Sequence, residues 1–218
     1  MPNEGQWLKL LRRRDLSGEE VEALLQDRAA RRYHAVRLAL AAHPRTPRRE
    51  ALSLVETLFW RDLAALSADS RVHPEVRRAA DRDLLRRLPE MALSERVDLA
   101  KCVGRGTLIA LRLDSEPRVL EALLENRFLT EADVIQASIH GGATESSLAL
   151  IAAHPRWSLR QGVRSALLRN PTLPVPVALG LLPRASRADL DGILESPQAA
   201  EILKACAERI LARRVFGV

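Results

Sequence analysis

The chain has 218 residues, of which 47% are hydrophobic and 28% are charged. This balance excludes an intrinsically disordered chain, which has too few apolar side chains to bury, and the length suits one elongated domain or two small ones. Aromatic residues make up only 3% of the chain. The core must therefore be aliphatic, and Leu and Ala are strong helix formers.

The charge of the chain is basic and uneven. The net charge is +6, and all but three of the 34 basic side chains are Arg. Residues 1–109 carry 21 basic and 16 acidic side chains, a net charge of +5, which leaves only +1 for residues 110–218. Any electrostatic contact with an anionic partner, such as a nucleic acid, is therefore expected in the first half of the chain.

No segment indicates export, membrane insertion or a cofactor. The first residues lack the charged region and apolar run of a signal peptide, and no stretch approaches the roughly 20 apolar residues of a membrane span. Cys102 and Cys206 lie on the apolar stripes of two predicted helices, where a thiol acts as a small hydrophobe. We expect a cytoplasmic protein with no membrane partner, no metal and no small-molecule cofactor.

Signals for the start of a helix recur along the chain. Ser17 and Glu20 form the pattern of a capping box. Thr46 and His73 are each followed by Pro, which is typical of an N-cap and the first helical residue. Further N-caps are predicted at Ser94, Ser115, Thr130, Ser158, Ser186 and Ser196.

The expected helices are numerous and short. We expect roughly a dozen, mostly about 8–14 residues long and joined by short loops, and no segment alternates as a strand does. Gly104 and Gly141 predict C-terminal caps. Asp133 and Asp189 stand where a carboxylate favours the start of a helix. The longest helix is expected over about residues 197–214.

A segment with a His-Pro turn recurs in the chain. The sequence Leu-Ala-Ala-His-Pro-Arg of Leu40–Arg45 returns at Ile151–Arg156 with Ile in the first place, and Asn170 and Pro171 form a related turn. The spacing from His43 to His73 is 30 residues. Such recurrence is the sequence signature of stacked repeats.

A second kind of turn alternates with the first. Residues 69–78 and 114–119 each carry an acidic residue, then Pro, then Val at the start of a predicted helix. The alternation resembles the leucine-rich repeat variant and HEAT-like families over about residues 40–215, in about five degenerate units. The resemblance implies a right-handed α-solenoid and a binding role. No Cys precedes residue 102, so the iron–sulfur segment found in some leucine-rich repeat variant proteins is not expected.

We predict a single all-α repeat domain over residues 1–218, because one helix pair cannot bury its own apolar face without stacked neighbours. Residues 1–35 are expected to form N-terminal capping helices. Residues 36–140 form the first repeat block, and residues 141–218 form the second, which ends in a C-terminal capping helix. The Gly-Gly pair that follows His140 is a candidate hinge between the blocks.

The segment from Phe59 to Asp62 groups aromatic, cationic and acidic side chains. In HEAT-like DNA glycosylases that act on alkylpurines, aromatic, Asp and Arg side chains hold damaged DNA, so Trp60, Arg61 and Asp62 are candidate binding residues. The simpler interpretation is that Trp60 packs between units and Asp62 favours a helix N-terminus. The repeat offset aligns Asp62 with Asp189, which favours the structural interpretation.

Clusters of Arg offer a second candidate surface. The candidate binding residues among them are Arg45, Arg48, Arg49, Arg77 and Arg78, and further clusters occur at 12–14, 31–32, 82 and 86–87. Aligned in a stack, they would form a basic stripe for phosphates. The alternative is a solvated face whose charge is offset by neighbours such as Asp81. Aromatic residues interleaved with basic ones, which single-strand binders use, are nearly absent.

The remaining motifs predict structure rather than chemistry. The histidines that precede Pro, at three equivalent positions, favour a role in turns over metal ligation. Trp157 is a candidate binding residue, but its position beside such a turn is more typical of packing. No catalytic motif is found. We expect a non-catalytic protein-interaction scaffold that binds another protein; the alternative is a nucleic-acid-binding HEAT-like protein, most sharply a DNA alkylpurine glycosylase-like repair protein.

Overall fold

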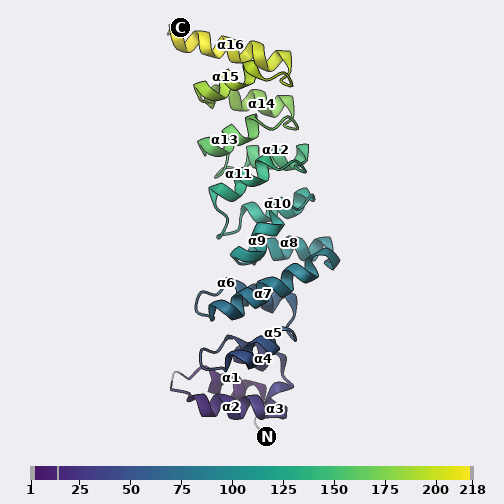
Figure 1. Ribbon diagram of the computed structural model, residues 1–218, viewed down its shortest axis with the longest axis vertical. Coiled ribbons are helices and arrows are strands. Elements are labelled where there is room, and N and C mark those ends of the chain that lie inside the picture. The colour runs from purple at the N-terminus through teal and green to yellow at the C-terminus, as the bar shows by residue number, and fades with distance from the viewer. Residues whose placement is uncertain (1–2, 14, 217–218) are drawn as a thin grey trace. The chain divides into compact units, whose positions relative to one another are not determined.

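The computed structural model describes residues 3–13 and 15–216 (Figure 1). Every regular element in these ranges is a helix, with 16 α-helices and two short 3-10 helices. The predicted all-α fold is therefore confirmed, although the helices outnumber the expected dozen. Arg14, part of one Arg cluster, lies outside the described residues. Within the described ranges, no helix has both the length and the apolar character needed to cross a membrane.

The chain divides into two compact units, Met1–Leu108 (unit 1) and Ile109–Val218 (unit 2). The expected boundary between repeat blocks, at residue 140, falls inside unit 2 and stays a prediction. The helices α11 and α12, which the Gly-Gly pair after His140 connects, pack against each other.

Unit 1 is a succession of short helices. They are α1 (Glu4–Leu11), α2 (Gly18–Gln26), α3 (Arg28–Arg31), α4 (His34–Ala42), α5 (Arg48–Val55), α6 (Trp60–Ala68), α7 (Pro74–Arg87), η1 (Leu88–Glu90), α8 (Leu93–Cys102) and the start of α9 (Arg105–Leu111). α4 packs on α1 and α5, α5 packs on α7, and α6 packs on both α7 and α8.

Unit 2 repeats one packing pattern. Its helices are α10 (Pro117–Leu124), α11 (Glu131–Ile139), α12 (Glu145–Ala153), α13 (Gln161–Leu168), α14 (Val175–Leu181), η2 (Leu182–Arg184), α15 (Arg187–Glu195) and α16 (Glu201–Phe216). From α10 to α16, each helix packs on the next helix but one, and Figure 1 shows these helices layered in chain order. Every helix thus buries its apolar face against neighbours rather than within one pair.

Four of the nine predicted helix starts are confirmed. Ser17, Thr130 and Ser186 each accept a hydrogen bond from the backbone N–H three residues later, and the acidic residue there bonds back to the cap. His73 caps α7, with Pro74 as the first helical residue. These signals act within one turn of the chain, so the local sequence is sufficient to predict them.

Other predicted N-caps are wrong. Thr46 instead donates its hydroxyl to the Leu40 carbonyl, at 2.7 Å, and so ends α4 rather than starting α5. Ser196 is the C-cap of α15, and α16 therefore begins only at Glu201. Ser94, Ser115 and Ser158 are not N-caps either, because the caps of α8, α10 and α13 are Ala92, Glu116 and Arg160. With 16 residues, α16 is the longest helix described, as predicted.

The recurring turns are built by a His or Asn side chain, which precedes Pro in all of them except the turn at Asn126. The Nδ1 atoms of His43, His73 and His154 each accept a hydrogen bond, at 3.2 Å, from the backbone N–H two residues later. Asn126 and Asn170 do the same through Oδ1, at 2.8 and 2.9 Å. These contacts confirm the turn role of the three histidines, which replace the Asx side chain that more often makes such turns.

The two predicted glycine caps follow the C-cap residues of α8 and α11, but neither has a left-handed backbone. Gly104 instead serves a close approach between helices. Its backbone N–H donates to Ser67 Oγ at 3.1 Å. A Cβ at Gly104 would lie 2.5 Å from the Ser67 carbonyl oxygen, whereas a Cβ at Gly141 would meet nothing within 4 Å.

Candidate functional site

The loop between α5 and α6 presents an aromatic ring to solvent. Phe59 is the N-cap residue of α6 and is 65% exposed, the largest fraction among the exposed large hydrophobic residues described. Its ring stacks on the imidazole of His34, with a centroid distance of 4.3 Å and an interplanar angle of 29°. The stacking contact thus orients an aromatic ring that remains largely exposed.

Two side chains fix the imidazole beneath Phe59. His34 Nε2 lies 2.6 Å from Asp62 Oδ2, and its Nδ1 lies 3.2 Å from Arg37 Nη2. Arg37 can only donate, so Nδ1 accepts and Nε2–H donates to Asp62, which is the pattern of a neutral imidazole. Arg37 is itself held by the Arg31 carbonyl, at 3.0 Å. Asp62 therefore positions His34.

Trp60 and Arg61 lie beside Phe59 at the start of α6. The indole N–H of Trp60 donates to Glu95 Oε1 of α8 at 3.1 Å. The guanidinium carbon of Arg61 lies 5.1 Å from the centroid of the Trp60 ring, a cation–π contact. Arg61 is mostly exposed, and its Nη2 lies 3.9 Å from Asp98 Oδ2. Trp60 is thus partly buried, and its indole N–H joins the start of α6 to α8.

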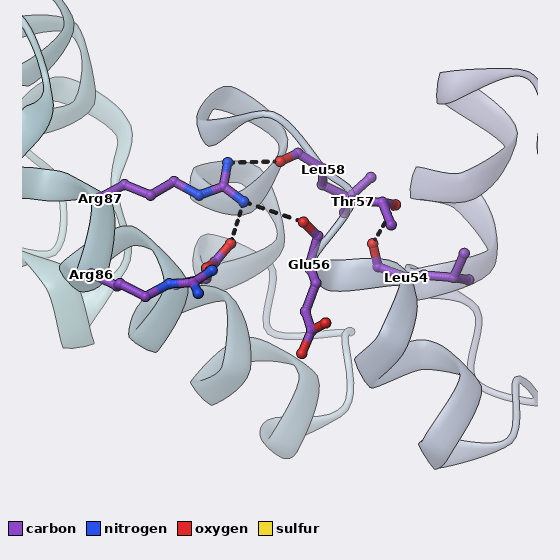
Figure 2. Close-up of polar contacts among 7 residues, drawn as sticks. Leu54, Glu56, Thr57, Leu58, Arg86 and Arg87 are labelled. Carbon is purple, nitrogen blue, oxygen red and sulfur yellow. Dashed lines mark hydrogen bonds and ion pairs between the residues drawn. The ribbon is translucent and has the colours of Figure 1, made fainter.

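Arg87 anchors the loop before Phe59, and Figure 2 shows its contacts with Glu56 and Leu58. It donates to the carbonyls of Leu58, at 2.9 Å, and Glu56, at 3.4 Å. The buried carboxylate of Asp83 pairs with both Arg86 and Arg87 and so orients the Arg87 guanidinium. We call His34, Phe59, Trp60, Arg61 and Asp62 the Phe59 surface.

The predicted basic residues at the start of α5 and α7 lie together. Arg48 Nη1 donates to Glu75 Oε1 at 2.9 Å, and Arg48 Nη2 lies 2.8 Å from His73 Nε2. These contacts place the start of α5 beside the start of α7. Arg45 donates to the Leu16 carbonyl. Among the described residues, the side chains of Arg49 and Arg78 have no hydrogen-bond or ion-pair partner.

The structure does not bring these five arginines to the Phe59 surface. Arg77 and Arg78 lie near the start of α7, whereas Arg87 at its end contacts the loop before Phe59. Arg78 and Arg87 are nine positions apart in α7, which corresponds to about 13 Å along a helix axis. Of the predicted basic residues, Arg61 alone lies with Trp60 and Asp62. The arginines near the start of α5 and α7 thus form a second, separate edge.

Asp81 near this basic edge has a structural role. Its Oδ1 accepts hydrogen bonds from the backbone N–H of Thr107, at 3.0 Å, and from the Thr107 hydroxyl, at 2.8 Å. Burial raises the pKa of Asp81 above its ordinary value of 3.8, and the bonds from Thr107 and the charge of Arg77 oppose that rise only in part. Asp81 thus holds the start of α9 through Thr107. Burial removes water from its carboxylate, which disfavours the charged form.

Asp81→Asn should make stability less dependent on pH. The folded state holds the Asp81 proton more tightly than the unfolded state, so the wild type loses this contribution as the pH rises through the raised pKa. Asn stays neutral and keeps an oxygen for both Thr107 donors. Urea unfolding between about pH 4 and pH 7 should show that the free energy of unfolding of the variant increases relative to that of the wild type as the pH rises. A decrease relative to the wild type over this range would contradict the raised pKa of Asp81.

Trp157 lies in the core of unit 2. It is 1% exposed, and its indole N–H donates to the Leu124 carbonyl at 3.0 Å. The guanidinium carbon of Arg156 covers the ring at 4.2 Å from its centroid. These contacts leave the indole no free face for a partner, so its observed role is packing.

Two members of the Phe59 surface, His34 and Phe59 itself, were not among the predicted binding residues. His34 precedes no Pro and lies outside the recurring turns. The available signal was spacing, since His34 and Asp62 are 28 residues apart, the distance from Asn126 to His154. Comparison with protein-family models, curated proteins and solved structures found no match to the chain.

Proposed function

We propose that the chain is a non-catalytic, right-handed α-solenoid of the HEAT-like or leucine-rich repeat variant kind that acts as a cytoplasmic protein-interaction scaffold. Its proposed contact site is the Phe59 surface. No cofactor and no catalytic step are invoked, because the polar groups of this surface hold one another rather than a reacting centre.

A ladder of acidic side chains supports the repeat interpretation. The third residue of α6, α8, α11 and α15 is acidic in each case: Asp62, Glu95, Asp133 and Asp189. Each contacts a side chain from an earlier segment of its own unit: His34, Trp60, Arg112 and Ser165, respectively. One contact type thus recurs from layer to layer, as expected of stacked repeats.

The observation that carries the function is the exposed, immobilised ring of Phe59. Binding hot spots are aromatic or Arg side chains that fill a partner pocket, and an ordered side chain loses little further entropy on binding. Covering a Phe ring contributes about 1.5–3 kcal/mol. The chain is poor in aromatic residues, yet Phe59, Trp60 and Arg61 are consecutive.

The charges around Phe59 favour a protein over a nucleic acid as the partner. Asp62, Glu95 and Asp98 lie within or beside the surface, and Arg61 is near one of them. Carboxylates repel phosphates, so this surface lacks the basic groove that single-strand binders use. The glycosylase alternative requires Asp62 to face DNA on a basic surface, whereas Asp62 is bonded to His34 and the basic edge lies elsewhere.

Site-specific photo-crosslinking tests the proposal. A photoreactive phenylalanine analogue is placed at position 59 or at Leu159, which is 63% exposed and serves as a matched control. In the native cell, position 59 should give a discrete protein adduct that position 159 does not give. Adducts to nucleic acid at position 59, or the same adducts at both positions, would contradict the proposal.

A further inference from the structure

Units 1 and 2 share local contacts at an offset of 127 residues. Arg87 donates to the Leu58 carbonyl in unit 1, and Arg214 donates to the Ala185 carbonyl, at 2.8 Å, in unit 2. Two further pairs of Arg-to-carbonyl bonds differ by the same offset: Arg87 to Glu56 with Arg214 to Pro183, and Arg37 to Arg31 with Arg164 to Ser158. Residues 31–87 of unit 1 therefore correspond to residues 158–214 of unit 2.

Each unit has a cavity at corresponding positions. The cavity of unit 1, at α4, α5 and α7, has a volume of about 120 Å³, and the cavity of unit 2, at α13, α14, α15 and α16, has a volume of about 330 Å³. All nine residues that line the cavity of unit 1 correspond to residues that line the cavity of unit 2. The two cavities are thus one feature of the repeat, present in two sizes.

The smaller cavity has two long side chains that the larger one lacks. Arg48 and His73 both line the cavity of unit 1, where Arg48 Nη2 lies 2.8 Å from His73 Nε2. The corresponding residues of unit 2 are Val175 and Ala200, whose side chains are too short to meet in this way. Unit 2 therefore leaves open a space that side chains of the chain itself occupy in unit 1.

The wall of the unit 2 cavity is largely aliphatic. It includes Leu168, Leu173, Ala178, Ile193 and Leu203. An engineered cavity of about 150 Å³ lined by Leu, Ile and Phe stays dry and binds benzene. A cavity of about twice that volume therefore suits a fused bicyclic hydrocarbon.

The charged residues of this wall disfavour a charged ligand. The Asp189 side chain is 2% exposed, and its Oδ2 accepts hydrogen bonds from the hydroxyls of Ser186, at 2.6 Å, and Ser165, at 2.8 Å. Arg169 Nη2 lies 3.9 Å from Asp189 Oδ1 and places a positive charge at the same wall. A cation would be repelled by Arg169 and an anion by Asp189, so a neutral ligand is favoured.

The neutral polar residues of the wall offer little to a polar ligand. Asn170 Nδ2 donates to the Ser138 carbonyl at 2.6 Å, and its Oδ1 accepts from the Thr172 backbone N–H at 2.9 Å. Ser196 Oγ accepts from the Gln198 backbone N–H at 3.4 Å, and Gln198 is itself exposed. A ligand in this cavity would therefore be held by its apolar surface.

We propose that the cavity of unit 2 binds a neutral, apolar small molecule of about the size of a fused bicyclic hydrocarbon. The ligand takes the space that the side chains of Arg48 and His73 take in unit 1. Burial of its apolar surface against the aliphatic wall supplies the affinity. The site lies within unit 2 and does not depend on the Phe59 surface.

Ligand-observed nuclear magnetic resonance titration of the full chain tests the proposal. The three probes share one bicyclic carbon skeleton: indane, 2-aminoindane hydrochloride and sodium indane-2-carboxylate. Saturable binding of indane is expected, with both charged derivatives at least about tenfold weaker, because an unpaired charge is costly in an apolar site. No saturable binding of indane, or binding of either charged derivative at least as tight as that of indane, would overturn the proposal.

Variants locate the site within unit 2. Val175→Arg combined with Ala200→His gives unit 2 the side chains of unit 1 and should abolish indane binding. Gly192→Leu should block the cavity without harm to the fold, since Gly192 lines it, a Cβ there meets nothing within 4 Å, and Leu favours helix. Gly180→Leu, at a helical glycine that is equally open but outside the cavity wall, should bind indane as the wild type does. Urea unfolding checks that each variant is folded, and undiminished indane binding by the folded double variant or by Gly192→Leu would overturn the proposal.

Discussion

Trp157→Ala is expected to lower the free energy of unfolding by about 3–5 kcal/mol, the range for removing a large aromatic side chain from a core. Trp157 is 1% exposed and is the one aromatic among the largest fully buried side chains described. Its loss would also leave the Leu124 carbonyl without the indole N–H, which lies 3.0 Å away. Urea unfolding followed by far-ultraviolet circular dichroism measures the change.

Trp157→Phe and Trp60→Ala serve as controls for this prediction. Phe keeps most of the apolar volume but cannot donate to the Leu124 carbonyl, so its cost should be intermediate. Trp60 is only partly buried and bonds a side chain rather than the backbone, so Trp60→Ala should cost less than Trp157→Ala. A loss below about 1 kcal/mol for Trp157→Ala would mean that the indole does not support the core of unit 2.

Gly104→Ala is expected to destabilise unit 1 by about 3 kcal/mol, the upper end of the usual cost of overpacking. The added Cβ would lie 2.5 Å from the Ser67 carbonyl oxygen and 2.7 Å from its carbon. Both are backbone atoms, so relief requires α6 or the α8–α9 connection to move. The movement would also disturb the bond from the Gly104 N–H to Ser67 Oγ.

Gly141→Ala is the matched control, because Gly141 also follows a helix directly and a Cβ there meets nothing within 4 Å. Its free energy of unfolding, measured by urea titration, should change by no more than an ordinary surface substitution does, about 0.5 kcal/mol in either direction. Equal effects of the two substitutions would show that backbone freedom, not the contact with Ser67, accounts for the glycine at position 104.

Local features of the fold were predictable from the sequence. The capping boxes of Ser17, Thr130 and Ser186 join residues three apart, and the His turns join residues two apart. The pattern of neighbouring residues is therefore enough to indicate them. Thr46 shows the limit of such patterns: its hydroxyl can serve the helix before it or the helix after it, and the chain uses the former.

The candidate site depended on contacts that local patterns do not encode. Phe59 and His34 are 25 residues apart in sequence and stack because of the way the helices of unit 1 pack. Likewise, Arg61 is near Arg77 in sequence, but α7 places Arg77 and Arg78 at the end remote from the loop before Phe59. The alignment of Asp62 with Asp189 was more informative, since both prove to be third residues of helices.

The most direct test of the proposed scaffold function is the affinity of the crosslinked partner for wild type, Phe59→Ala and Leu159→Ala. Both substitutions are at exposed positions and should leave stability within about 0.5 kcal/mol of wild type. Phe59→Ala should weaken binding about tenfold or more, as removal of a hot-spot ring does, and Leu159→Ala should not. Unchanged affinity in Phe59→Ala, together with a steep loss in added salt or on replacement of Arg49 and Arg78, would contradict the proposal and assign binding to the basic edge.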